Sequence, residues 1–212
     1  MSNQPDYRKL ILVPAIITLG VTIVRLLGEL YGGPELLFGR QAGGGGALVG
    51  ISWILIPFGI YFAISLSRSG FPAKSCGKLI GMAILSFILM MVIGAGAMIL
   101  LASTPAAGLV ITSLAAVGVM FLVKSSWPEL FKTLVLYAFA ARIPVAIIMF
   151  FAILGDWGTH YDAPPPEMEG MNWMAEWFLT GLIPQFTVWI ATTAVIGGLF
   201  GGIAGLFVKS KQ

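Results

Sequence analysis

Long apolar blocks alternate with short polar segments along the whole chain. A helix that crosses the hydrocarbon core of a bilayer needs about 20 predominantly apolar residues. Blocks of this kind occur at about residues 10–27, 47–66, 79–102, 106–123, 133–155 and 184–208. The pattern predicts an all-α polytopic membrane protein, a bundle of six transmembrane helices that forms a single integral membrane domain over residues 1–212.

The two ends of this pattern need separate interpretation. No small-residue cleavage pattern follows the first block before "GELYGG", so we expect a retained helix and not a cleaved signal peptide. Near the other end, Pro184 follows "MNWMAEWFLTGLI", which predicts a short interfacial helix at about 171–182 before the last span. Trp173 and Trp177 are four residues apart, so they share a helix face and suit an aromatic belt.

Composition supports the membrane assignment. Of the 212 residues, 58% are hydrophobic and 10% are charged, whereas about 25% of the residues in a soluble domain are charged. The net charge of +3 comes from basic residues in short loops between apolar blocks, so we expect a lipid bilayer as partner and no nucleic acid. The lone Cys76 excludes an internal disulfide framework and a thiolate metal cluster.

The distribution of charge predicts the orientation. Nine basic residues fall on one side of the membrane if both termini share that side, namely Arg8, Lys9, Arg68, Lys74, Lys78, Lys124, Lys132, Lys209 and Lys211. The opposite side has Arg40 as its only loop cation and carries the acidic loop 156–177. Because cytoplasmic loops are enriched in Lys and Arg, both termini are expected in the cytoplasm. The predicted location is the plasma membrane, or the inner membrane if the source is a bacterium.

Small residues predict close helix packing in the last span. Gly197, Gly198, Gly201, Gly202 and Gly205 give overlapping GxxxG spacings, which let helix backbones approach each other. Packing within the chain is the favoured interpretation. The alternative is an interface with a second copy or with a partner in a larger membrane complex.

Arg142 lies near the middle of the fifth block. An arginine at the bilayer centre costs about 2.5–3.5 kcal/mol even on insertion scales, so it should face the bundle interior or water. Ala138 and Ala146, one turn away on each side, allow a neighbouring helix to approach. No acidic residue is expected at its depth, and Pro144 frees the carbonyl of Ala140, which Arg142 could bind.

Two polar stripes accompany this arginine. Thr18, Thr22, Arg25 and Glu29 recur at helical spacing on the first span, and Gln185, Trp189 and Thr192 do so on the last. The candidate ligand-binding residues are therefore Arg25, Glu29, Arg142, Gln185, Thr18, Thr22 and Thr192. Two arginines with one acid favour an anion or a zwitterion. The alternative is structural, with Arg25 and Glu29 as an ordinary i,i+4 pair and Arg142 satisfied by hydroxyls.

The outer loops offer further polar groups. Asp156, His160 and Asp162 could supply metal ligands, but HExxH spacing is absent and a hydrogen-bonded His160 is the favoured interpretation, so no metal and no cofactor is expected. His160 could also sense pH. The stretch "FGRQAGGGGALVG" is interpreted as a flexible linker, with an anion site at a helix N-terminus as the alternative.

No sequence motif identifies a family or a reaction. The best functional hypothesis is a small carrier or permease with an outward-facing polar site for an anionic or zwitterionic small molecule. The first alternative is a non-catalytic subunit or assembly factor of a larger membrane complex. The second is an outer-face metal-dependent enzyme at Asp156, His160 and Asp162.

Overall fold

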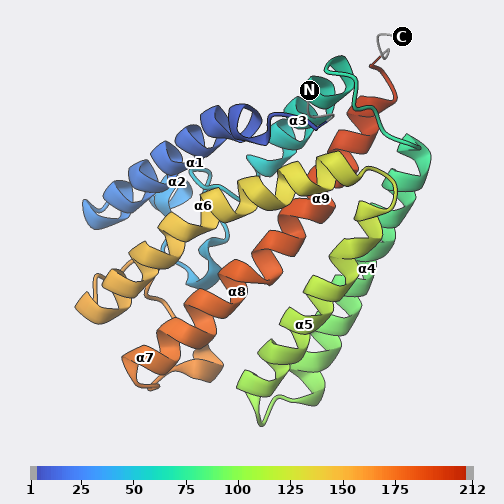
Figure 1. The fold of residues 1–212 in the computed structure, drawn as a ribbon. Helices are drawn as coiled ribbons and strands as arrows, with labels where there is room; N and C mark the ends of the chain where they lie inside the picture. The colour runs from blue at the N-terminus through green and yellow to red at the C-terminus, as the bar shows by residue number, and fades with distance from the viewer. Residues whose placement is uncertain (1–3, 209–212) are drawn as a thin grey trace.

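The computed structural model describes residues 4–208, in which all regular secondary structure is helical (Figure 1). The long helices are α1 (Tyr7–Leu30), α4 (Cys76–Leu100), α5 (Pro105–Lys124), α6 (Pro128–Gly155) and α9 (Val188–Gly205). The shorter elements are α2 (Glu35–Phe38), η1 (Ala42–Gly44), α3 (Leu55–Arg68), η2 (Pro166–Met168), α7 (Trp173–Glu176), the π-helical η3 (Trp177–Leu182) and α8 (Ile183–Phe186).

Five helical segments are long and apolar enough to cross a membrane, if α7 to α9 are taken as one rod over Trp173–Gly205. The prediction of six spans is therefore supported in part. The block at 47–66 is helical only over the 14 residues of α3, which gives about 21 Å at a rise of about 1.5 Å per residue. Residues 45–54 form turns and bends instead. Glycines with positive φ at Gly43, Gly44 and Gly46 begin this stretch, and such a backbone cannot continue a right-handed helix.

The last rod differs from the expected short helix followed by a straight span. The chain continues from α7 through the π-helical turns of η3 into α8, and Pro184 sits in the first turn of α8, where its missing N–H is tolerated. The rod is interrupted at Thr187, whose φ of −123° and ψ of −79° are not helical. Each of these irregularities rotates the helix faces that follow relative to a regular 3.6-residue repeat.

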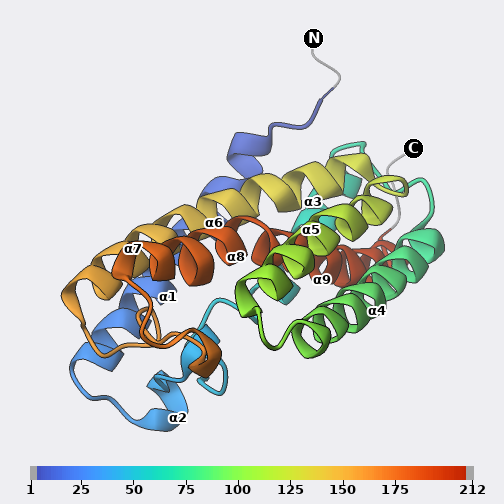
Figure 2. The same ribbon diagram turned by 90° about the horizontal axis from the view of Figure 1, so that it is seen from below.

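α9 lies at the centre of the bundle and packs against α3, α4, α5 and α6 (Figures 1 and 2). The five glycines of this helix make the contacts. Gly197 faces Leu134, Gly198 faces Val123, and Gly202 faces Leu79 and Ile80. Gly201 lies against Leu130 and the carbonyl of Gly59, so α3 and α9 approach backbone to backbone. The glycine spacing thus serves packing within the chain, as favoured from the sequence.

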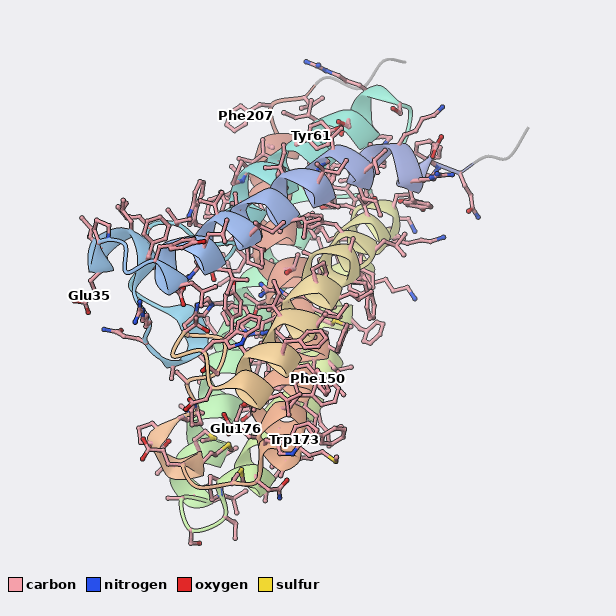
Figure 3. The ribbon with its side chains drawn as sticks, turned by 90° about the vertical axis from the view of Figure 1, so that its left-hand side faces the viewer. Glu35, Tyr61, Phe150, Trp173, Glu176 and Phe207 are labelled. Carbon is pink, nitrogen blue, oxygen red and sulfur yellow. The ribbon has the colours of Figure 1, made fainter. Side chains whose placement is uncertain are left out.

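The basic loops gather at one end of the bundle. The Lys74 N–H donates to the Ser126 carbonyl at 3.1 Å, and the Trp127 indole donates to the Phe71 carbonyl at 2.9 Å. The ammonium of Lys132 stacks on the ring of Tyr7 at the start of α1. Figure 3 shows Trp173 and Glu176 at the opposite end of the molecule from Phe207. Lys209 and Lys211, which contribute to the predicted orientation, lie outside the described residues.

The aromatic residues of α7 and η3 pack as their spacing predicts. Trp173 and Trp177 both contact the ring of Phe150 edge-on, with ring centroids 5.7 Å and 5.2 Å apart. The Trp177 indole also donates to the Ala146 carbonyl of α6 at 3.0 Å. This short segment is therefore attached to α6 at the end of the bundle opposite the basic loops.

The close approach of α3 and α9 gives a stability prediction. A Cβ atom at Gly59 would lie 2.5 Å from the Gly197 carbonyl oxygen, so Gly59→Ala must force two backbones apart. We expect Gly59→Ala to lower the free energy of unfolding by about 1–3 kcal/mol, the usual cost of overpacking. Gly81→Ala on α4 is the matched control, because a Cβ there meets nothing within 4 Å. Equal stability of the two variants in detergent unfolding would contradict the packing described.

Candidate functional site

The polar stripe of the first span is the buried face of α1. Thr18, Thr22, Arg25 and Glu29 are all at most 4% exposed, although α1 lies at the edge of the bundle. The hydroxyl of Thr18 is hydrogen-bonded to the Tyr137 hydroxyl of α6 at 2.7 Å. The spacing in the sequence therefore identified correctly which side of α1 turns inward.

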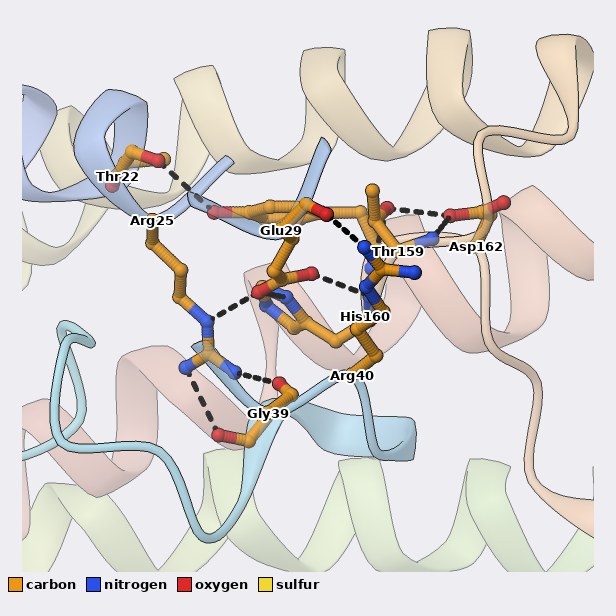
Figure 4. A network of polar contacts seen from close by, with 10 residues as sticks. Thr22, Arg25, Glu29, Gly39, Arg40, Thr159, His160 and Asp162 are labelled. Carbon is orange, nitrogen blue, oxygen red and sulfur yellow. Dashed lines mark hydrogen bonds and ion pairs between the residues drawn. The ribbon is translucent and has the colours of Figure 1, made fainter. Parts of the chain in front are cut away.

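Arg25 and Glu29 form a buried ion pair. The Nε of Arg25 donates to Oε1 of Glu29 at 2.7 Å, as the i,i+4 spacing suggests. The other two guanidinium nitrogens donate to the carbonyls of Gly39 and Gly44 at 2.9 Å and 3.0 Å (Figure 4). Gly39 and Gly44 of the glycine-rich segment thus bind a cation through their carbonyl oxygens, an interaction that neither the linker nor the anion-site interpretation included.

Glu29 also binds the loop that follows α6. One carboxylate oxygen accepts the His160 backbone N–H at 2.8 Å, and the other lies 2.6 Å from Nδ1 of the same residue (Figure 4). Arg40 donates to the backbone carbonyl of Glu29 from the glycine-rich segment. Glu29 and its partner Arg25 together therefore connect α1, the segment 39–44 and the loop 156–172.

The environment of His160 shifts its titration. Burial lowers the pKa of His160 below its usual value of 6.5, and the hydrogen bond to Glu29 offsets this effect only in part. Arg25 lowers the pKa of His160 further, and Asp162 of its own loop acts in the opposite direction. The imidazole is accordingly neutral near pH 7, with Nδ1–H donated to Glu29.

Asp156 and Asp162 have local structural roles. Asp156 ends α6 in a left-handed conformation with φ of 49°. Asp162 accepts hydrogen bonds from the backbone N–H groups of Gly158 and Thr159, both at 2.7 Å. Within residues 4–208 no group of three His, Cys, Asp or Glu side chains is placed to hold a metal ion. His160 faces Glu29 rather than these two aspartates.

Arg142 is 5% exposed and has no carboxylate partner among the described residues. Its Nη1 donates to Oε1 of Gln185 at 3.2 Å, and its guanidinium stacks on Trp189 at 4.6 Å from the ring centroid. Its Nε–H has no hydrogen-bond partner. Of the groups proposed from the sequence, Gln185 contacts Arg142, whereas the Ala140 carbonyl freed by Pro144 is not used.

A cavity of about 240 Å³ lies beside Arg142. Four of the seven predicted ligand-binding residues line it, namely Thr22, Arg25, Arg142 and Gln185, and His160 lines it from the loop 156–172. Thr18, Glu29 and Thr192 do not line it, and neither do Asp156 and Asp162. The hydroxyl of Thr192 donates to the Val188 carbonyl within α9.

Several lining residues were not predicted from the sequence. Gly50, Ile51 and Ser52 come from the irregular segment 45–54, part of which the sequence predicted as the start of a helix. The glycine run ahead of them was the available signal, because irregular backbone within a membrane occurs where it lines a cavity. The loop 156–172 adds Tyr161, Ala163, Pro165, Glu167 and Met168, and the α4–α5 hairpin adds Met98 and Leu109.

The charges around the cavity do not cancel locally. Arg25 is neutralised by Glu29, and the neutral His160 adds no charge near pH 7. Arg142 is left as an unpaired cation in the cavity wall, and Glu167 is an exposed carboxylate on the outer loop. The arrangement is therefore suited to receive one negative group close to Arg142.

No protein-family model, no curated protein and no solved structure matches the chain. The fold itself defines the class. Five apolar helices of spanning length around a buried polar network make this a multi-pass α-helical membrane protein.

The network around Glu29 makes a stability prediction. Glu29→Gln removes the counterion of Arg25, which remains 4% exposed. We expect a loss of about 3–5 kcal/mol in the free energy of unfolding, as for other buried ion pairs that lose one partner. Glu35→Gln, at an exposed position on α2 (Figure 3), is the control and should change stability by less than about 0.5 kcal/mol. Similar losses in both variants would contradict a structural role for Glu29.

The lowered pKa of His160 makes stability depend on pH. The unfolded chain binds a proton at this histidine near pH 6.5, whereas the folded chain does so only at lower pH. Stability is therefore complete above pH 6.5 and falls as pH drops through this value toward the folded pKa. We expect the thermal midpoint in detergent to decrease between about pH 7.5 and about pH 5.5, and His160→Gln to reduce that decrease. If the thermal midpoint of His160→Gln decreased by the same amount, titratable groups other than His160 would be responsible for the pH dependence.

Proposed function

We propose that this protein is a small carrier of the permease type, with a binding site for an anionic or zwitterionic small molecule in the cavity beside Arg142. The observation that carries the proposal is the unpaired, buried guanidinium of Arg142 in the cavity wall. A charged group inside a membrane protein is costly and marks a substrate or ion pathway in most cases. The ligand would supply the negative charge that no carboxylate of the described residues places beside Arg142.

The irregular segment 45–54 supports the same proposal. Transporters place their sites at interrupted helices, where freed backbone groups line the binding cavity. Here the span that contains α3 is interrupted in this way, and Gly50, Ile51 and Ser52 contribute to the lining. The break at Thr187 lies between Gln185 and Trp189, which both line the cavity.

The proposed orientation places the cavity toward the outside of the cell. The basic loops lie at the end of the bundle opposite the cavity, so by the positive-inside rule that end is cytoplasmic. The loop 156–172 then covers the cavity from the outside. We place the protein in the plasma membrane, or in the inner membrane of a bacterium, with both termini in the cytoplasm.

A role as a subunit or assembly factor of a larger membrane complex is a second candidate. The contacts of α9 do not favour it, because the five glycines of this helix contact α3, α4, α5 and α6 of the same chain. An interface with a second copy or another protein would use a different face of the bundle.

Water access to the cavity tests the proposal directly. In a Cys76→Ser background, Thr22→Cys and Ser52→Cys place thiols on the cavity lining, whereas Thr192→Cys places one off it. We expect a membrane-impermeant maleimide added outside the cell to label the first two variants and not the third. Thr22 is the informative position, because it is 2% exposed and reachable only through the cavity.

Two outcomes would contradict this proposal. Labelling of Ser52→Cys alone would mean that outside water does not reach the depth of Thr22. Labelling of Thr22→Cys only from the cytoplasmic side would mean that the cavity opens toward the cytoplasm, opposite to the proposed orientation. Retention of a monodisperse elution profile in each variant controls for misfolding.

A further inference from the structure

The α4–α5 hairpin lines the cavity with apolar residues only. Arg25 of α1, Arg142 of α6, His160 of the loop 156–172 and Gln185 of α8 supply polar groups. Met98 of α4 and Leu109 of α5 form an apolar wall that contributes no polar side chain. A ligand that fills the cavity therefore needs one charged end and one apolar end.

The apolar wall reaches the surface that faces lipid. Met98 is 37% exposed, and Leu114 and Ile99 on the outward side of the same hairpin are 69% and 74% exposed. Figure 1 shows the α4–α5 hairpin diverging from α7 and α8 toward this end of the bundle. The lining of the cavity thus includes both the buried Arg142 and the partly exposed Met98.

The size of the cavity agrees with a ligand that is only partly enclosed. Pockets that enclose a drug-sized molecule have volumes of about 300–1,000 Å³, whereas this one has about 240 Å³. It has room for a head group and the first few carbons of a chain. The rest of a longer chain would lie between α5 and α8, in the bilayer.

The charge of the outer loop disfavours a soluble anion. Residues 156–177 contain Asp156, Asp162, Glu167, Glu169 and Glu176 and no lysine or arginine. This loop covers the cavity on the water side, where its field repels free anions. An amphiphile already dissolved in the membrane avoids that barrier.

We propose that the ligand is a membrane-borne amphiphile with one anionic head group, a carboxylate or a phosphate, which binds Arg142 and Gln185 while its chain passes Leu109 and Met98 into the bilayer. The inference rests on the proposed function of the cavity as an anion site. It adds the chemical class of the substrate and the direction from which it arrives.

The test compares chain lengths at constant head-group chemistry. Protein in nanodiscs of phosphatidylcholine is titrated with radiolabelled decanoate, butyrate, decyl phosphate and inorganic phosphate, and binding to empty nanodiscs is subtracted. We expect decanoate to bind about tenfold more tightly than butyrate, or decyl phosphate about tenfold more tightly than inorganic phosphate, because buried methylene groups contribute to affinity. Decyltrimethylammonium, a cation with the same chain, should not bind.

Three variants locate the two ends of the ligand. Arg142→Gln should weaken binding of the ten-carbon anions about tenfold or more, because it removes the positive charge that binds the anionic head group. Leu109→Trp should weaken the decyl compounds and leave the short anions unchanged, because it fills the apolar wall. Leu114→Trp is the matched control on the lipid-facing side of α5 and should change neither.

The outcomes separate this inference from the proposed site. Arg142-dependent binding of butyrate or phosphate, with no gain from the decyl chain, would overturn the amphiphile and leave the anion site standing. Decyl binding that is insensitive to Arg142→Gln would overturn both. Binding of none of the four compounds would overturn the inference, and the maleimide experiment would then decide on the cavity alone.

Discussion

The low polarity of the bilayer interior is the constraint on which this structure depends. A carboxylate taken out of water must be compensated, and the Glu29 carboxylate receives donors from two separate parts of the chain, Arg25 of its own helix and His160 of the loop after α6. Arg40 binds the backbone carbonyl of the same residue, and Arg25 also binds the carbonyls of Gly39 and Gly44. Since these partners belong to different segments, satisfying one buried ion pair also holds together the end of the bundle opposite the basic loops.

The same constraint distinguishes Arg25 from Arg142. Arg25 has a counterion and two carbonyl acceptors, so its charge is satisfied by the fold. Arg142 has an amide oxygen and an aromatic face, and neither carries a full negative charge. The sequence suggested both arginines as members of one site. In the structure Arg25 is part of the framework that supports the cavity, whereas Arg142 is available to bind an anion.

The spacing of polar and apolar residues in the sequence predicted helices and buried faces correctly where the helices are regular. The spacing of Thr18, Thr22, Arg25 and Glu29 identified the buried face of α1, and the apolar blocks located the long helices to within a few residues. It was insufficient where the backbone departs from a regular helix. The block at 47–66 contains enough apolar residues for a span, yet the positive φ of Gly43, Gly44 and Gly46 precedes a stretch without helix. The helical count from Gln185 predicted Trp189 and Thr192 on the site, and only Trp189 lines the cavity.

The glycine contacts of α9 divide the molecule into two mechanical regions. Around Gly59, Gly197 and Gly201 the backbones of α3 and α9 touch, so sliding one past the other would create steric overlap. At Thr187 and within residues 45–54 the backbone departs from a regular helix, and these are the places where a change of backbone angle costs least. Both places border the cavity. The bundle thus has a rigidly packed region at the basic end and a more deformable region around the cavity. A movement that opens or closes the cavity would change backbone angles in the deformable region and leave the packed helices in place.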